Sequence, residues 1–210
     1  MVERSGWDEL TAKNPEHSAW YVERFRSMAE AGDDLAGEAR LIDAMVPRRA
    51  RILDAGCGPG RVGAFLFGVG HTVVGVDGDP VLISAAEEDH PGPQWLVGDL
   101  VELDLASRGI EEGFDAIVCA GNVMTFLAAS TRREVLTRLG QHLRPQGRIV
   151  TGFGGGRGYD FDAFREDVTA AGLSLELELE SWDGRPLTSE SGFIVAVVGR
   201  LRDPDSEFRS

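Results

Sequence analysis

The chain has 210 residues, of which 42% are hydrophobic and 27% charged, so it is large enough to bury a core without disulfides or metals. Its formal net charge of -14 argues against nucleic acid or an anionic membrane as a partner, because phosphate groups would be repelled. The cysteines and histidines lack metal-ligand spacing, so no metal site is expected. The N-terminus has no apolar signal-peptide core and no run is long enough for a membrane span, which predicts a cytoplasmic protein.

Two helices are predicted ahead of the first strand. An Asn-Pro pair at 14–15 gives a helix start, and apolar residues then recur at helical spacing until Gly32 ends the segment. An aspartate at 33 or 34 caps a second helix, which Pro47 stops. Both helices precede the first strand, so we expect them to be an addition to the core.

Residues 52–61, with the sequence ILDAGCGPGR, indicate a strand, a tight glycine-rich loop and the start of a helix. A side chain in such a loop would prevent the sharp turn and keep the backbone N–H groups away from a ligand. Asp54, at the carboxyl end of the strand, can accept hydrogen bonds from a positively charged ligand group. The stretch therefore predicts a nucleotide site.

Two cofactor classes use a loop of this kind. Gly58 to Gly63 fits G-x-G-x-x-G, the dinucleotide fingerprint, and Asp77 follows about 20 residues later, as that fingerprint requires. The longer pattern from Asp54 to Gly60, an acid followed by three alternating glycines, resembles motif I of the class I S-adenosylmethionine-dependent methyltransferases.

Strands and helices alternate after the glycine loop, which predicts a parallel sheet with helices on both faces. The strands are expected at 71–77, 94–97, 114–119 and 148–153, and the helices at 62–69, at 80–89 and after Ser130, with a turn at 145–147.

The last two strands break the alternation. Between 173 and 180, leucines alternate with serine and glutamates, which predicts an edge strand with one dry face and one charged face. Turn residues at 183–186 lead into an unbroken apolar run at 193–198, so the final strand is expected to be buried. We predict a hairpin whose last strand lies antiparallel beside the fifth strand, whereas a dinucleotide domain would continue with parallel strands.

The methyltransferase resemblance covers roughly residues 47–200. It implies an α/β three-layer sandwich of the Rossmann-like type, with a seven-stranded, mostly parallel sheet in the order 3-2-1-4-5-7-6 and N-terminal lid helices. We expect one domain, 1–210, with a helical lid at 1–46 and the core at 47–202. The implied reaction is in-line transfer of the methyl group of S-adenosyl-L-methionine, which releases S-adenosyl-L-homocysteine. Short loops around the pocket suggest a small-molecule acceptor, and a protein side chain is the alternative.

The predicted cofactor contacts lie mainly where strands end. Asp77 can accept both hydroxyl hydrogens of a ribose, or it can be a plain turn residue. By resemblance, Asp99 would accept a hydrogen bond from the adenine amino group and Leu100 would pack on the ring. The whole predicted set is Tyr21, Arg24, Asp54, Gly56, Cys57, Gly58, Gly60, Asp77, Asp99, Leu100, Ala120, Gly121 and Asn122.

The first predicted helix is aromatic over 17–24, and its aromatic residues could also be plain core. If they serve the site, Tyr21 would hold the sulfonium by cation–π attraction, and Arg24 or alternatively Arg26 would bind the methionine carboxylate.

The catalytic residues are not identified by the sequence. His17 is a candidate general base only through its place on the presumed lid, and Arg157 and Tyr159 are candidates for contact with the acceptor. Two alternatives stay open: a module that binds S-adenosylmethionine without methyl transfer, and a nicotinamide-dependent oxidoreductase. The oligomeric state is not predicted.

Overall fold

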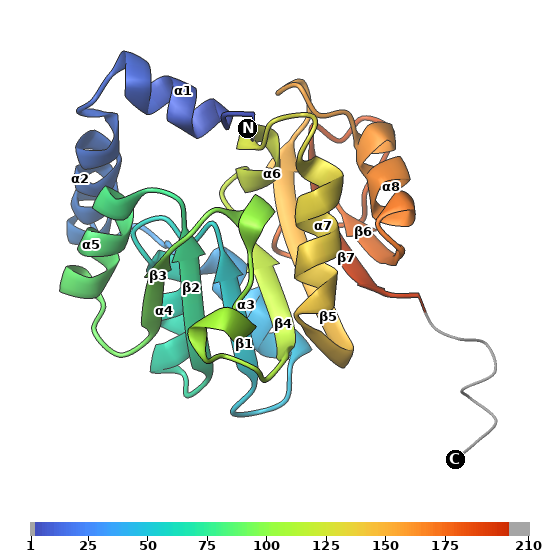
Figure 1. Ribbon diagram of the computed structural model, residues 1–210, viewed down its shortest axis with the longest axis horizontal. Coiled ribbons are helices and arrows are strands. Elements are labelled where there is room, and N and C mark those ends of the chain that lie inside the picture. Colours follow the sequence, from blue (N-terminus) through green and yellow to red (C-terminus); the bar gives the residue numbers. More distant parts are fainter. Residues whose placement is uncertain (1–2, 202–210) are drawn as a thin grey trace.

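Seven strands form one sheet in the computed structural model, which describes residues 3–201 (Figure 1). The order is β3-β2-β1-β4-β5-β7-β6, and β7 runs antiparallel to both of its neighbours. The predicted strand order and the antiparallel last strand are confirmed. The strands are β1 (Arg51–Ala55), β2 (Thr72–Asp77), β3 (Gln94–Val97), β4 (Phe114–Cys119), β5 (Leu143–Gly154), β6 (Leu173–Leu179) and β7 (Phe193–Arg200).

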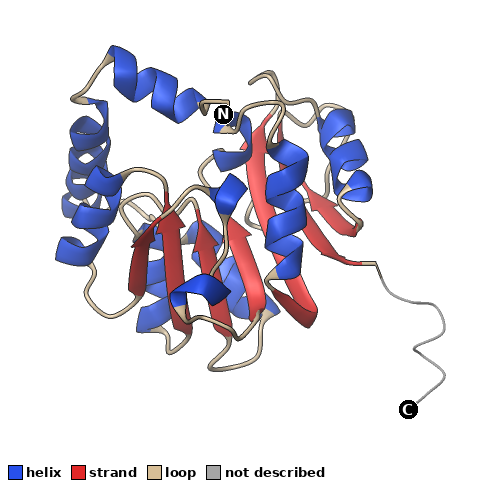
Figure 2. Cartoon of the chain, viewed as in Figure 1, coloured by secondary structure: helices blue, strands red, loops and turns tan. Residues whose placement is uncertain are grey.

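Helices cover both faces of this sheet (Figure 2). Successive side chains of a strand point to opposite faces, so Ile52 of β1 packs in the core with α3 and α4, while Leu53 packs in the core with α7 and α8. The helices of the two layers are α3 (Gly37–Met45), α4 (Arg61–Gly68), α5 (Pro80–Asp89), α7 (Arg132–Gln141) and α8 (Phe161–Ala170). Short helical turns are η1 (Leu100–Glu102), η2 (Ala106–Arg108) and α6 (Val123–Phe126).

Two further helices lie beyond the carboxyl ends of the parallel strands. Helix α2 (His17–Glu30) begins directly after the predicted Asn-Pro start. Helix α1 (Gly6–Lys13) is absent from the sequence prediction, and none of its side chains is fully buried. Its sequence signal is a capping box, in which the Ser5 and Asp8 side chains each bond to the other residue's backbone N–H. Within residues 3–201, no helix has the length and apolarity needed to cross a bilayer.

Strand β6 lies at the edge of the sheet, as expected, but its leucines do not share one face. The register with β7 shifts between Leu175 and Leu177. Because side chains alternate in direction, the extra residue puts Leu173 and Leu179 into cores on opposite sides of the sheet. Leu177 is left 49% exposed. The prediction of one dry leucine face is therefore wrong. Residues 145–147, predicted as a turn, lie inside β5.

One indole fills the space beneath the glycine loop. Trp95 of β3 is 6% exposed and pairs across the strands with Gly75 of β2. A Cβ atom at Gly60, Gly63 or Gly75 would lie 3.0, 2.9 or 2.2 Å from Trp95 ring atoms. Two glycines of the G-x-G-x-x-G pattern, Gly60 and Gly63, therefore leave room for the Trp95 indole. Packing explains their presence, and a bound dinucleotide is not required.

Candidate functional site

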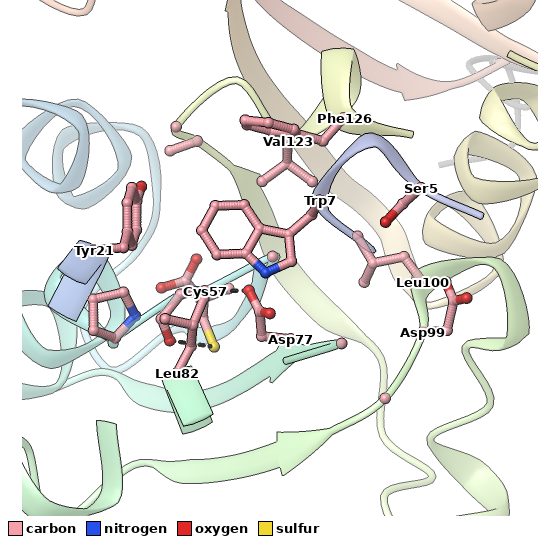
Figure 3. Close-up of a pocket in the computed structure, with 18 of the residues that line it drawn as sticks. Ser5, Trp7, Tyr21, Cys57, Asp77, Leu82, Asp99, Leu100, Val123 and Phe126 are labelled. Atoms are coloured by element: carbon pink, nitrogen blue, oxygen red, sulfur yellow. Dashed lines mark hydrogen bonds between the residues drawn. The ribbon is translucent and has the colours of Figure 1, made fainter. Parts of the chain in front are cut away.

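A cavity of about 250 Å³ lies between the carboxyl ends of the strands and helices α1 and α2 (Figure 3). The predicted contacts that line it are Tyr21, Asp54, Gly56, Cys57, Gly58, Asp77, Asp99, Leu100, Ala120 and Gly121. Residues that line it without having been predicted include Trp7 of α1, Arg61 of α4 and Phe126 of α6. The structure thus brings together groups that are more than a hundred residues apart in the sequence.

The glycine loop turns with positive φ angles, 76° at Gly56 and 54° at Gly58, a region where a Cβ atom is strained. The loop is also crowded, because a Cβ at Gly56 would lie 2.5 Å from a methyl carbon of Val123. At Gly58, the nearest neighbour of a Cβ would be a ring carbon of Tyr21, at 3.8 Å. Glycine is therefore required for the turn at both positions and for close packing at the first.

Asp77 is held in place by the backbone. Its Oδ2 atom accepts a hydrogen bond from the Gly58 N–H at 2.8 Å, and its Oδ1 atom accepts one from the Asp79 N–H at 2.9 Å. Each carboxylate oxygen has two lone pairs, so each retains the capacity to accept one further hydrogen. Burial raises the pKa of Asp77, and the two backbone hydrogen bonds oppose that rise. This geometry fits a ligand with two neighbouring hydroxyl groups.

Asp54 is the more deeply buried acid, with 2% of its surface exposed. Its Oδ2 atom accepts a hydrogen bond from the Gly63 N–H at 2.8 Å. Burial raises the pKa of Asp54 to about 7, and the hydrogen bond from Gly63 opposes the rise. A cationic ligand group in the cavity would favour the ionised form of this carboxyl.

Aromatic rings form the wall of the cavity on the side of the N-terminal helices. The Tyr21 ring lies 5.2 Å from the Trp7 ring and 5.0 Å from the Phe25 ring, both edge to face. The Phe126 ring lies 5.7 Å from that of Trp7 on the opposite side. Burial raises the pKa of Tyr21, so its phenol is neutral near pH 7. Such a wall can attract a positively charged ligand.

The predicted arginine contacts lie away from the cavity. The Arg24 guanidinium lies 5.9 Å from the ring centroids of Trp20 and Phe25, and Arg24 is not among the residues that line the cavity. Arg26 pairs with Asp89 of α5 at 2.9 Å. Neither arginine is placed as the sequence analysis expected.

The cation that lines the cavity is Arg61, the first residue of α4. Its guanidinium donates to the Glu38 carboxylate and, at 2.8 Å, to the Leu35 carbonyl oxygen. It also lies 5.5 Å from the Phe25 ring centroid. The only sequence signal for this residue is its position directly after the glycine loop.

Two predicted contacts serve the framework. Asn122 has a φ of 66°, and its Oδ1 atom accepts a hydrogen bond from the Gly154 N–H at 2.8 Å, which ties the end of β4 to the end of β5. Gly60 packs on Trp95. Neither Asn122 nor Gly60 is among the residues that line the cavity.

The candidates for catalysis and acceptor contact also lie outside the cavity lining. Tyr159 is 2% exposed, stacks on Phe153 and donates its hydroxyl hydrogen to Asp167 at 2.8 Å, so it belongs to the core. The His17 ring packs against Trp7 and Trp20 at 5.1 and 5.3 Å. Arg157 is exposed beside Gly154. Among residues 3–201, no cluster of three or more His, Cys, Asp or Glu side chains is arranged to hold a metal ion.

Comparison with known proteins points to one family. Residues 52–147 match the model of a methyltransferase domain. The putative methyltransferase YqeM of Bacillus subtilis (strain 168) is 27% identical over 138 residues, which span 60% of this chain but only 53% of that protein.

Solved structures agree with this match. The CcbJ methyltransferase of Streptomyces caelestis shares the fold, with a TM-score of 0.71 at 17% identity over 79% of this chain and 90% of that one. A TehB-like S-adenosylmethionine-dependent methyltransferase of Corynebacterium glutamicum superposes with a TM-score of 0.84. It is 50% identical, and the match covers 89% of this chain and 100% of that one. The 50% identity, together with the confirmed strand order and the glycine loop that lines the cavity, shows that the chain belongs to the class I S-adenosylmethionine-dependent methyltransferases.

Proposed function

We propose that this chain transfers the methyl group of S-adenosylmethionine to a small-molecule acceptor. The observation that carries the proposal is the cavity itself, in which a glycine loop with positive φ angles, the buried Asp54, the half-buried Asp77 and an aromatic wall face the same space. When bound, the cofactor supplies an electrophilic methyl group on a sulfonium. The residues of this chain would hold the two reactants aligned and exclude water.

Six of the lining residues have proposed roles. Asp77 would accept the ribose hydroxyl hydrogens, and Asp99 and Leu100 would contact the adenine. Asp54 would stabilise the cationic methionine end of the cofactor, and Arg61, which lines the cavity, would bind the methionine carboxylate in place of Arg24. Cys57, whose pKa is raised by burial, would line the site as a neutral thiol.

The nature of the acceptor is inferred from what covers the cavity. Ser5, Trp7 and Asp8 close it from the α1 side, and Val123 and Phe126 close it from α6. A small molecule fits a partly covered cavity of this kind, and a protein side chain is the alternative acceptor. The single domain with a lid at 1–46 and a core at 47–202, the cytoplasmic location and the lack of a nucleic-acid or membrane partner remain predictions, and residue 202 lies outside the described residues.

Calorimetric titration with S-adenosylmethionine, S-adenosylhomocysteine and NAD tests the proposal. We expect both adenosyl sulfur compounds to bind with micromolar dissociation constants and NAD not to bind. Turnover is then sought by incubating the protein with S-adenosylmethionine and a panel of small-molecule acceptors, and release of S-adenosylhomocysteine is measured. Binding of NAD alone would contradict the proposal, and binding without turnover would favour the non-catalytic alternative.

Cofactor binding should also depend on pH through Asp54. Its pKa of about 7 means that the carboxyl is mostly protonated at pH 6, whereas a cationic ligand favours the ionised form. We therefore expect binding of S-adenosylhomocysteine to release up to one proton per site at about pH 6, and the affinity to rise until about pH 7 and then level off. Calorimetry in two buffers with different ionisation enthalpies measures the released proton.

The matched variant for this prediction is Asp54→Asn, which keeps the shape of the side chain but cannot ionise. We expect it to lose the proton release that Asp54 provides. If the variant binds and releases as many protons as the wild-type protein, another acid is responsible, and Asp77 would be the next candidate because burial raises its pKa too.

A further inference from the structure

Helix α1 covers the cavity but contributes little to the hydrophobic core. Its Trp7 and Asp8 line the cavity together with the capping residue Ser5, yet no side chain of the helix is fully buried. Figure 1 shows α1 crossing beyond the carboxyl ends of the strands, from α2 to α6. An element of this kind opens at a low free-energy cost unless specific bonds fasten it. Its few polar contacts therefore decide how firmly it closes the cavity.

Asp79 provides the most buried of these contacts. It is 8% exposed, and its Oδ2 atom accepts hydrogen bonds from Trp7 Nε1 at 2.8 Å and from the hydroxyl of Ser18 on α2. Its Oδ1 atom accepts a hydrogen bond from the Val81 N–H at 2.9 Å and caps α5. One carboxylate thus ties both N-terminal helices to the first turn of α5.

The same residue adjoins the proposed ribose contact. The backbone N–H of Asp79 donates to Asp77 Oδ1. The Trp7 indole reaches into the cavity on the side of Asp77 and packs with Leu82 and Tyr21 (Figure 3). An adenosyl group bound at Asp77 would therefore lie next to the indole that Asp79 holds.

We propose that Asp79 is a positioning residue that fastens α1 over the bound cofactor through the Trp7 indole, and so limits the rate at which S-adenosylhomocysteine leaves. A hydrogen bond to a buried carboxylate is stronger than one between neutral groups, because the acceptor is charged and shielded from water. Opening of α1 breaks this bond. The retention of S-adenosylhomocysteine rests on the proposed function, whereas the fastening of α1 does not.

Two variants remove the same hydrogen bond from opposite ends. Trp7→Phe keeps an aromatic ring but has no N–H, and Asp79→Asn keeps the Oδ1 cap of α5 but replaces the Oδ2 acceptor by a donor. The matched control is Trp20→Phe, because the Trp20 indole is 54% exposed on α2 and does not line the cavity. Thermal melting of each variant shows that it is folded.

Two rates are then measured in the full chain. Hydrogen exchange of the α1 backbone amides is followed in the ligand-free protein, and dissociation of S-adenosylhomocysteine is followed by surface plasmon resonance. We expect Trp7→Phe and Asp79→Asn each to raise both rates roughly tenfold, as for loss of a hydrogen bond to a charged group. The double variant should exceed Asp79→Asn by little, since Asp79→Asn already removes the Trp7 bond along with the acceptor of Ser18. Trp20→Phe should leave both rates unchanged.

Each contrary result overturns a defined part of the inference. Unchanged exchange of α1 in folded variants would overturn the fastening by Asp79. Faster exchange with an unchanged dissociation rate would overturn its role in retaining the ligand. A wild-type chain that does not bind S-adenosylhomocysteine would contradict the proposed function, and the exchange measurement would still decide whether Asp79 fastens α1.

Discussion

Replacement of Asp77 by alanine is expected to weaken the binding of S-adenosylhomocysteine by about ten- to hundredfold. The proposed ribose contact consists of hydrogen bonds to a charged acceptor, and the loss of such bonds costs about 1.5 to 3 kcal/mol. The variant also leaves the Gly58 and Asp79 N–H groups without their acceptor. The glycine loop thereby loses the 2.8 Å hydrogen bond from the Gly58 N–H to Asp77 Oδ2. Calorimetric titration measures the change in affinity.

The control for this variant is Asp162→Ala. Asp162 is an exposed acid of α8 that pairs with Arg165, away from the residues that line the cavity. Its replacement removes the same charge and should leave the affinity unchanged. If Asp77→Ala folds and binds S-adenosylhomocysteine as tightly as the control does, Asp77 is not part of the cofactor site.

Replacement of Gly75 by alanine is expected to lower the free energy of unfolding by about 3 kcal/mol. The added methyl carbon would lie 2.2 Å from a ring carbon of Trp95, which is buried and cannot swing into solvent. Either the indole leaves its site or β2 and β3 move apart, and each response breaks packing in the core. Chemical denaturation monitored by circular dichroism measures the loss.

Gly78→Ala is the matched control, because a Cβ at Gly78 meets no atom within 4 Å and its φ is not positive. It should change stability by no more than about 0.5 kcal/mol. A second test places Gly75→Ala in a Trp95→Leu background, where the smaller side chain should accept the methyl group and reduce its cost. Equal costs in both backgrounds would show that the indole is not what Gly75 accommodates.

The strands could be predicted from local patterns, and their order in the sheet was implied by the methyltransferase resemblance. Each apolar strand is marked by a pattern within one short stretch of sequence, and so are the glycine loop after β1 and the buried run at 193–198. The resemblance to the methyltransferases supplies how these strands are arranged in the sheet. The same holds for Asp54 and Asp77, which end adjacent parallel strands and therefore meet at one edge of the sheet.

The parts that could not be predicted depend on long-range packing. No side chain of helix α1 is fully buried, and its place is set by Trp7, whose partner Asp79 is 72 residues away. Whether Arg24 points to the cavity depends on which side of α2 faces the cavity. Aromatic residues lie on several sides of this helix, so the sequence does not identify that side. The shift in β6 follows from pairing with β7 and leaves no mark in the regular alternation of leucines.

The packing of Trp95 beneath the glycine loop limits which residues a relative of this chain can carry at the neighbouring positions. One indole occupies the space next to Gly60, Gly63 and Gly75, which belong to the loop, α4 and β2. A larger residue at any of the three would need a smaller residue at the Trp95 position. Gly60 also has a φ of 87°, and a Cβ at Gly63 would also lie 3.1 Å from Asp54 and Val73 atoms, so these two glycines have further reasons to be kept. The positions of Gly75 and Trp95 should therefore change together during evolution, so that a relative with leucine or valine at the Trp95 position could carry alanine where this chain needs glycine in β2.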